Sequence, residues 1–559
     1  MKKNILFLLS ILVLSNISAQ HVVLDKSKEH AVLKIDNQPF LMLSGELHNS
    51  TCSDIKYLDG VWDKLVSMNM NSVIATESWE LMEPQEGKYD FSRIDAVIKG
   101  AKEHNLKVAL IWFATFKNPF MTYCPSWVKS DNKRFPHSQT AEGKILEIPS
   151  LFDNKIIEAD LKAYKALLQH IKETDTNHTI IGIQIGNEPG LNSPTRDCSP
   201  AANKAWKADV PLQIIDYMVK NKGTMQPDIE NAWKANGYKK KGNWEEVFGK
   251  SLTKDDGSHP ILHLTEHLFT AYSFANYFQI LSSEGKKILN VPTFINATGM
   301  VNSRGRSMGN GCSIPDFFDI YMAVAPSLDA LTPNSYAKNF DAICEVFSYK
   351  NNPIFIPECS MSAVRPFYVF GEWDGLCHSP FAIDDYDAYT PEGKQLSEAY
   401  SLLSNMKNLI VANLNSEKMR GAYIYEGKPE EIIEMGDYKL TISNQIRNEI
   451  GEAMVLALAG EEAYNAMKNS KKEIPPFESA CLIIQTGKDE FYIAGGGVNV
   501  SFQLKDNIKA QFCDYDYIYE GYFNKDGEFE RGRLLNGDEQ NVFIPEGKIG
   551  ALQVKMYHF

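Results

Sequence analysis

Eight short apolar runs alternate with amphipathic helical stretches over about 350 residues, and this alternation limits the fold more than any other feature of the sequence. The runs span 39–47, 71–79, 106–113, 179–188, 288–297, 327–336, 352–358 and 375–381. Continuous apolar runs are typical of parallel strands covered on both faces, and the stretches between them supply the covering helices. Eight such units predict an α/β fold, a (β/α)8 TIM barrel.

An open doubly wound sheet is the main alternative for this alternation. That fold commonly carries a G-x-G-x-x-G turn after an early strand, and no such turn follows the early runs of this chain. Beyond the last run, short alternating segments such as those within 480–504 are separated by Gly, Asp and Asn turns, which is typical of an antiparallel β domain. We therefore predict a signal peptide over 1–19, a catalytic barrel over 20–400 and a C-terminal β-rich domain over 401–559.

The N-terminal residues have the pattern of an export signal. Lys2 and Lys3 precede an apolar run over 5–14, and small residues around Ala19 provide a cleavage site. The run is shorter than the ~20 residues that a membrane-spanning helix needs, so an uncleaved anchor is the weaker alternative. We expect the mature protein to begin near Gln20, to have no membrane span and to be periplasmic or extracellular.

The charge and the cysteine content argue against a nucleic-acid-binding protein and against a disulfide-stabilised fold. The chain has 57 Lys and Arg against 71 Asp and Glu, so it lacks the basic excess that binds nucleic acid, and a neutral or weakly charged substrate fits better. Its nine cysteines include no C-x-x-C pair, which argues against a disulfide framework and favours small buried side chains.

Two of the eight runs end on a glutamate: Glu188 closes the fourth and Glu358 closes the seventh. The carboxyl ends of barrel strands meet at one face, so both side chains are expected in the same cleft. Retaining glycoside hydrolysis needs such a pair, in which one carboxyl group protonates the leaving oxygen while the other attacks the anomeric carbon. One strand-end glutamate alone would suggest a salt bridge or helix cap, but the pair favours catalysis.

The sequence resembles glycoside hydrolase clan A, in which an Asn-Glu pair ends the fourth strand and a glutamate ends the seventh. "SGELHNS" (44–50) and "ATESWELMEPQEGKYDF" (75–91) are similar to the family 35 β-galactosidases, with some likeness to family 42, and the resemblance covers most of 35–385. The better-known members have "NLHEP" and "ENEYG" where this chain has "ELMEP" and "GNEPG". Glucose, xylose or arabinopyranose therefore stay open beside galactose.

The resemblance implies a role for individual residues. Glu188 would be the general acid/base and Glu358 the nucleophile, with the first protonated and the second ionised before reaction. Asn187 would bind the sugar 2-hydroxyl, and Tyr336 would contact the nucleophile. Four further residues are expected in the pocket wall: Trp79, Glu83, Asn118 and Trp373. The alternatives place Trp79 in the core, pair Glu83 with a cation and leave Lys117 and Asn118 in a solvated loop; His378 has the same standing as Trp373.

These features predict a retaining, exo-acting β-glycoside hydrolase, first of all a β-galactosidase, with a carbohydrate substrate and neither cofactor nor metal. A non-catalytic carbohydrate-binding barrel is the alternative from another class. The segment "HLTEH" (263–267) matches the H-x-x-E-H zinc-peptidase signature. However, it lies where a barrel needs its fourth helix, and no distal acidic ligand stands out. The sequence leaves the oligomeric state open, and we expect the β domain to support the barrel.

Overall fold

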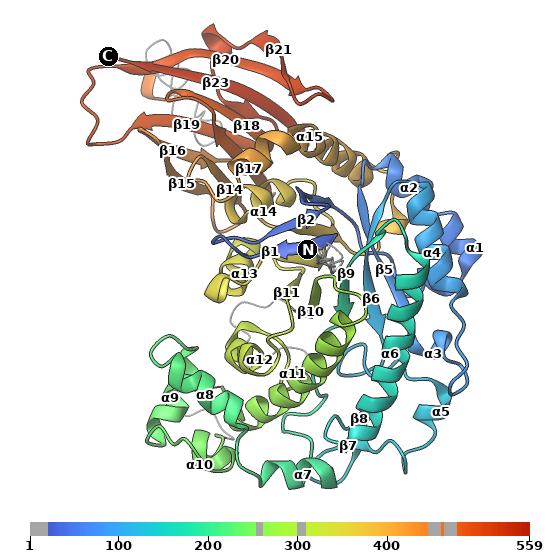
Figure 1. Cartoon of the computed structure of the whole chain (residues 1–559). Coiled ribbons are helices and arrows are strands. Elements are labelled where there is room, and N and C mark those ends of the chain that lie inside the picture. The colour runs from blue at the N-terminus through green and yellow to red at the C-terminus, as the bar shows by residue number, and fades with distance from the viewer. Residues whose placement is uncertain (1–20, 253–260, 299–308, 445–459, 463–477) are drawn as a thin grey trace, which may run out of the picture.

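A computed structural model describes residues 21–252, 261–298, 309–444, 460–462 and 478–559 (Figure 1). The predicted signal peptide and its cleavage site lie outside these residues. Eight parallel strands form one sheet and follow each other in space as they do in sequence. They are β4 (Met42–Leu43), β5 (Ser72–Ser78), β6 (Lys107–Phe113), β9 (Ile180–Ile185), β10 (Thr293–Thr298), β11 (Ala330–Ser335), β12 (Phe355–Cys359) and β13 (Cys377–Pro380).

The sheet closes at Glu46, which bridges in parallel to Ile74 on one side and to Phe381 on the other. This joins β4 to both β5 and β13, so the predicted (β/α)8 barrel is confirmed, and each of the eight apolar runs overlaps one of its strands. The strands are almost entirely buried because helices cover the outside while side chains fill the inside.

Helices follow every strand of the barrel. Along the chain these are α1 (Ile55–Asp59), α2 (Trp62–Ser67), α3 (Trp79–Met82), α4 (Ser92–Glu103), α5 (Ser126–Lys129), α6 (Asn154–Thr174), α11 (Leu264–Lys286), α12 (Phe318–Val324), α13 (Phe340–Phe347), α14 (Arg365–Trp373) and α15 (Pro391–Asn413). Asp153 caps α6 by accepting the Lys155 amide, and the apolar face of that helix packs on the barrel. Among the described residues, no helix combines the length and apolarity needed to cross a bilayer.

The "HLTEH" segment begins α11, as the barrel interpretation requires. His267 is buried, and its Nδ1 accepts the Gly311 amide at 3.2 Å. Burial lowers the pKa of His267 to about 4. The described part of the chain holds no group of three His, Cys, Asp or Glu side chains placed to bind a metal ion.

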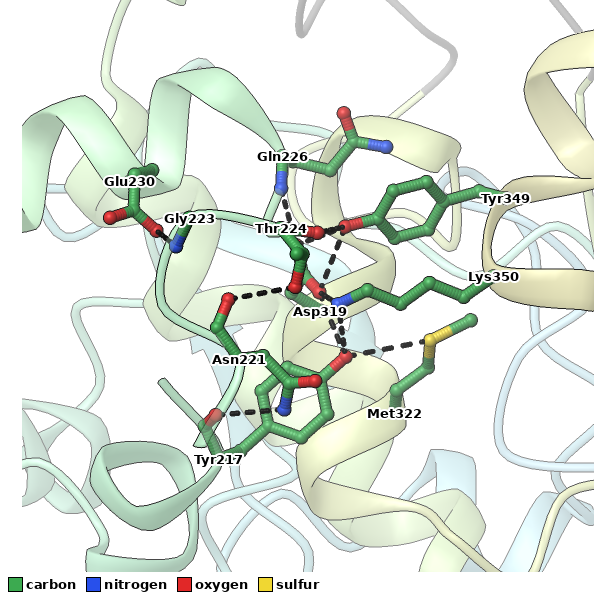
Figure 2. Close-up of polar contacts among 10 residues, drawn as sticks. All are labelled: Tyr217, Asn221, Gly223, Thr224, Gln226, Glu230, Asp319, Met322, Tyr349 and Lys350. Atoms are coloured by element: carbon green, nitrogen blue, oxygen red, sulfur yellow. Dashed lines mark hydrogen bonds and ion pairs between the residues drawn. The ribbon is translucent and has the colours of Figure 1, made fainter. Parts of the chain in front are cut away.

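An insertion of four helices lies between β9 and α11: α7 (Pro200–Trp206), α8 (Leu212–Lys220), α9 (Pro227–Ala235) and α10 (Trp244–Phe248). The sequence analysis did not predict these helices. Figure 2 shows that Asp319 of α12 anchors the insertion. Its buried carboxylate accepts the Tyr217 hydroxyl at 2.8 Å, the Gln226 amide at 2.6 Å and the Lys350 ammonium at 2.7 Å.

Replacing Asp319 with Asn is expected to destabilise the protein by roughly 3 kcal/mol, because the Lys350 charge would lose its partner in a mostly buried cluster. Chemical denaturation followed by tryptophan fluorescence measures the loss. Glu230→Gln is the matched control, since Glu230 is half-buried in the same insertion and, among the described residues, accepts the Gly223 amide alone (Figure 2). Equal stability of the two variants would contradict the anchoring role.

The C-terminal part has two antiparallel sheets and a hydrophobic core of its own. One sheet holds β14 (Met419–Ile424), β17 (Ser479–Gln485), β18 (Glu490–Gly496), β23 (Gly550–His558), β20 (Cys513–Phe523) and β21 (Phe529–Leu534). The other holds β15 (Glu430–Met435), β16 (Tyr438–Ser443), β19 (Val498–Leu504) and β22 (Phe543–Ile544). The predicted antiparallel character is confirmed, and β14 and β17 pack against α14 of the barrel (Figure 1).

Smaller elements complete the chain. An N-terminal sheet contains β1 (Val22–Asp25), β2 (Val32–Ile35) and β3 (Gln38–Pro39), and a hairpin contains β7 (His137–Gln139) and β8 (Ile145–Pro149). Seven of the nine cysteines are buried. Most of them therefore pack as small apolar side chains, as the sequence indicated.

Candidate active site

The end of β9 turns sharply to present Glu188 at the open face of the barrel. Gly186 (φ 80°) and Glu188 (φ 43°) both have left-handed backbone conformations. A Cβ atom at position 186 would lie 3.1 Å from the Phe116 ring, so glycine suits this position. A glutamate with positive φ is uncommon because this backbone conformation costs energy. Such strained residues are concentrated at functional sites, where the backbone holds a side chain in one direction.

Glu358 lies on β12 and is joined to Glu188 through one amide group. Asn334 of the neighbouring β11 donates from Nδ2 to Glu188 Oε1 at 3.1 Å and to Glu358 Oε2 at 2.8 Å. These two oxygens can be no farther apart than both distances laid end to end, 5.9 Å. Carboxyl groups about 5–5.5 Å apart are typical of retaining enzymes, whereas inverting enzymes need about 6.5–9.5 Å. The sequence prediction that both glutamates share a site is therefore met.

The groups around Glu358 have opposite effects on the pKa of its carboxyl group. Burial and the Glu188 charge raise the pKa of Glu358 to about 7, although the Lys117 cation and the hydrogen bond from Tyr336 act in the lowering direction. Tyr336 donates its hydroxyl to Glu358 Oε1 at 2.7 Å, which is the contact predicted for it. The ionised form that a nucleophile needs therefore predominates only above about pH 7.

Asn187 belongs to a buried amide network at the strand ends. Its Oδ1 accepts Gln184 Nε2 at 3.0 Å and Asn296 Nδ2 at 2.5 Å, while Asn296 Oδ1 accepts the Glu188 amide at 2.8 Å. Its own Nδ2 is buried without a hydrogen-bond partner among the described residues. A buried donor left unpaired is costly, so this group is suited to a ligand oxygen.

Sequence reasoning missed Asn296 and Asn334, although both lie in the apolar runs over 288–297 and 327–336. Asn296 also donates to Asn334 Oδ1 at 2.8 Å, so one chain of amides links Asn187 to both glutamates. Each asparagine lies near the carboxyl end of an apolar run, Asn296 in the fifth and Asn334 in the sixth. Because buried strands seldom contain an amide side chain, these positions could have indicated a functional role.

A third carboxyl group is close enough to the two glutamates for their charges to act on it. Glu46, at the closure of the barrel, is 1% exposed, and its pKa is raised well above the usual range by burial and by the charges of Glu358 and Glu188. The Lys117 cation opposes this increase. Glu46 was quoted within the first motif, but no role was predicted for it.

Trp79 and Glu83, which were predicted to line the sugar pocket, contact each other instead. Helix α3 turns the chain directly after β5 and buries both side chains completely. Trp79 Nε1 donates to Glu83 Oε2 at 2.7 Å, and the Gly87 amide donates to Glu83 Oε1 at 2.6 Å. Both carboxylate oxygens are thus occupied in holding the loop after β5. The alternative that placed Trp79 in the core holds, although the partners of Glu83 are an indole and an amide.

Trp373 is also misplaced by the sequence analysis. It is the last residue of α14 and lines a cavity with His30 and Asp374, next to Ile354 and Leu376, which precede β12 and β13. This is the amino end of the strands, opposite the glutamates, because a barrel helix runs back from the open face. His378 points outward from β13 toward Phe340, with its Nε2 3.3 Å from Cys359 Sγ.

Asn118 is held by its own loop, and its place in the sugar pocket stays a prediction. It follows β6 and is buried, but its Oδ1 accepts the Phe120 amide at 3.0 Å and so stabilises its own loop. The neighbouring Lys117 supplies the charge that acts on Glu46 and Glu358.

The C-terminal sheets are tied to the loops that follow Glu358 and Tyr336. Arg365 at the start of α14 is buried and pairs with Glu478, directly before β17. The same guanidinium donates to Ser360 Oγ at 3.2 Å and to the Ala337 carbonyl at 3.1 Å. Ser360 and Ala337 follow Glu358 and Tyr336 closely in sequence, so this ion pair connects the second domain to both loops.

Two close carboxyl groups, an unpaired amide donor and a tyrosine on one carboxylate form a site that can cleave a glycosidic bond by double displacement. The family model described as "Beta-galactosidase", glycoside hydrolase family 42, matches residues 58–346, more than half of the chain. The chain belongs to this family. The finer assignment to family 35 is not supported, because the matching model is that of family 42. A second model, "Domain of unknown function (DUF5597)", matches residues 396–545.

Solved structures of β-galactosidases are similar at low identity. The enzyme from Bacillus circulans sp. alkalophilus is 13% identical with a TM-score of 0.44, over 66% of this chain and 57% of that one. The enzyme from the psychrophilic Marinomonas ef1 is 11% identical with a TM-score of 0.42, over 66% and 60%. That from the haloarchaeon Halorubrum lacusprofundi is 13% identical with a TM-score of 0.42, over 65% and 58%. This chain thus spans less than two thirds of the length of each.

Proposed function

We propose that this protein is a retaining, exo-acting β-galactosidase that acts on oligosaccharides or polysaccharides outside the cytoplasm. The observation that carries the proposal is the Asn334 amide, which hydrogen-bonds one oxygen of each glutamate and so holds the pair at the separation of a retaining enzyme. The family description favours galactose as the glycone, with glucose, xylose and arabinopyranose as alternatives. The N-terminal sequence supports export.

In the proposed mechanism Glu188 protonates the glycosidic oxygen while ionised Glu358 attacks the anomeric carbon. The bond from that carbon to the leaving oxygen breaks, and a glycosyl ester forms on Glu358. Glu188 then takes a proton from water, which attacks the same carbon and releases Glu358. Asn187 Nδ2 would donate to the sugar 2-hydroxyl, a contact that strengthens in the transition state.

Hydrolysis of p-nitrophenyl β-galactoside, β-glucoside, β-xyloside and α-arabinopyranoside tests the proposal, with NMR of the first-formed anomer. We expect the β-galactoside to react fastest and the first product to keep the substrate's anomeric configuration. An inverted product would contradict the nucleophile assignment. Binding of oligosaccharides without hydrolysis of any glycoside would favour a non-catalytic sugar-binding barrel.

The pH profile provides a further prediction. Because Glu358 must be ionised, kcat/KM should fall about tenfold per pH unit below about pH 7. Replacing Lys117 with Met removes the cation that favours the ionised form, so the acid limb should move to higher pH. The loss should exceed about tenfold at pH 6 and be much smaller at pH 8.5. Lys117→Arg keeps the charge and is the control; an equal loss at every pH would argue against this electrostatic role.

A further inference from the structure

Glu46 is the one member of the carboxyl cluster that the proposed mechanism does not use. Its backbone is fully engaged in closing the barrel: its amide donates to the Pro380 carbonyl at 2.8 Å, and its carbonyl accepts the Ile383 amide at 3.0 Å. Its side chain is buried, yet Oε2 has no hydrogen-bond partner among the described residues. An unpaired oxygen in this position needs a partner that the described chain does not supply.

The direction of the side chain follows from the charges around it. The charged groups that act on Glu46 are Glu358, Glu188 and Lys117, which come from β12, the end of β9 and the loop after β6. These groups come from three sides of the barrel, so the Glu46 carboxyl group lies among the charged side chains at the open face. Glu77, by contrast, ends β5 with its charge near Arg93 and Asp90, on the helix side of the barrel wall.

We propose that Glu46 is a substrate-binding residue whose carboxyl group hydrogen-bonds one hydroxyl of the sugar that Glu358 attacks. This inference rests on the proposed glycosidase function and deepens it, since it names a specificity contact of the same site. The contact would be made with Glu46 as a neutral carboxylic acid, which can donate its proton to a hydroxyl oxygen and accept the hydroxyl proton in return.

Charge balance supports the neutral form. With Glu188 protonated as the acid and Glu358 ionised as the nucleophile, Lys117 is the cation among the described residues that acts on both Glu46 and Glu358, and its one charge balances Glu358 if Glu46 is neutral. A second carboxylate beside Glu358 would be uncompensated in a buried site, and such a charge is strongly disfavoured.

Glu46→Leu and Glu46→Gln test the contact with a series of p-nitrophenyl glycosides that lack one hydroxyl each, built on the glycone that the unmodified enzyme cleaves. For the intact substrate, Glu46→Leu should lower kcat/KM by about 10- to 100-fold, and Glu46→Gln by less than about fivefold. One deoxy substrate should be discriminated against by the unmodified enzyme but not by Glu46→Leu. An equal loss for every substrate would reduce Glu46 to a structural role and overturn the proposal.

The pH profile of Glu46→Gln provides a second readout that does not depend on the leucine variant folding. If Glu46 is neutral during turnover, its replacement by an amide leaves the acid limb of kcat/KM in place. A clear shift of that limb to lower pH would show that Glu46 is charged beside Glu358, which overturns the donor role.

Failure of this inference can be told apart from failure of the proposed function. If the unmodified protein cleaves no glycoside, calorimetric titration with galactose, glucose, xylose and arabinose replaces the kinetic assay. Glu46→Leu should then bind the intact sugar more weakly than the unmodified protein does, but bind one deoxy sugar equally well. That result would support the Glu46 contact in a protein that binds sugar without cleaving it. Unchanged binding, or no binding of any sugar by the unmodified protein, would overturn it.

Discussion

Replacing Glu358 with Gln is expected to lower kcat for the best aryl glycoside by at least ~10⁴-fold, because an amide cannot form the glycosyl ester. The fold should be unaffected, since glutamine has the same shape and can keep a hydrogen bond with Tyr336. A 2-deoxy-2-fluoro glycoside with a good leaving group should label the unmodified enzyme once, and the labelled peptide should contain Glu358. The variant should not be labelled.

Glu77→Gln is the matched control for this experiment. Glu77 is also a buried glutamate at a strand end, and burial raises its pKa to about 8, so an amide mimics its neutral form. Because its side chain lies on the helix side of β5, kcat/KM should stay within about threefold of the unmodified value. Labelling of a peptide other than that of Glu358 would contradict the nucleophile assignment, whatever the activity of the two variants.

The barrel was predictable because its strands are continuous apolar runs. Such a run can be recognised in the sequence without knowing which strands or helices pack against it. The two glutamates were predictable for a related reason: the carboxyl end of every barrel strand lies at one face. Glu188 and Glu358 therefore had to be close once the fold was right. The four-helix insertion anchored at Asp319 was not predicted, because its helices are short and its anchor comes from a distant part of the chain.

The remaining site residues depended on the direction of each side chain, which the sequence does not show. Glu358 points into the barrel while its neighbour Cys359 points out toward His378. Trp79 is buried in the core because α3 turns the chain immediately after β5. Trp373 lies at the wrong end of the barrel because a nine-residue helix carries it away from the open face.

Asn296, Asn334 and Glu46 were not predicted as site residues, because their sequence positions do not show which groups they contact. Each is a polar residue in or beside a strand, and a polar residue there can as well cap a loop or face a helix. Only the network shows that Asn334 joins the two glutamates and that Asn296 joins Asn187 to Glu188. The apolar runs that contain Asn296 and Asn334 were predicted as strands, but the contacts that give each residue a role come from neighbouring strands.

Replacing Glu188 with Gly is expected to separate the two steps of the reaction. A glycoside with a poor leaving group, such as an alkyl glycoside, needs protonation, so its kcat/KM should fall by about 10²–10⁴-fold. A 2,4-dinitrophenyl glycoside leaves without a proton, so its kcat/KM should fall by less than about tenfold, while kcat falls because no base activates water. Azide, which attacks without a base, should restore kcat and give a glycosyl azide of retained configuration.

Glycine is the informative substitution because of the backbone at this position. Residue 188 has a φ of 43°, a conformation that glycine adopts without the steric cost that a glutamate bears. Removing Glu188 also removes the charge that raises the pKa of Glu358. The variant should therefore unfold at a temperature equal to or above that of the unmodified protein, and its acid limb for the dinitrophenyl substrate should move to lower pH. Equal losses for both leaving groups, without rescue by azide, would show that Glu188 is not the acid, and a destabilised variant would show that its side chain holds the fold instead.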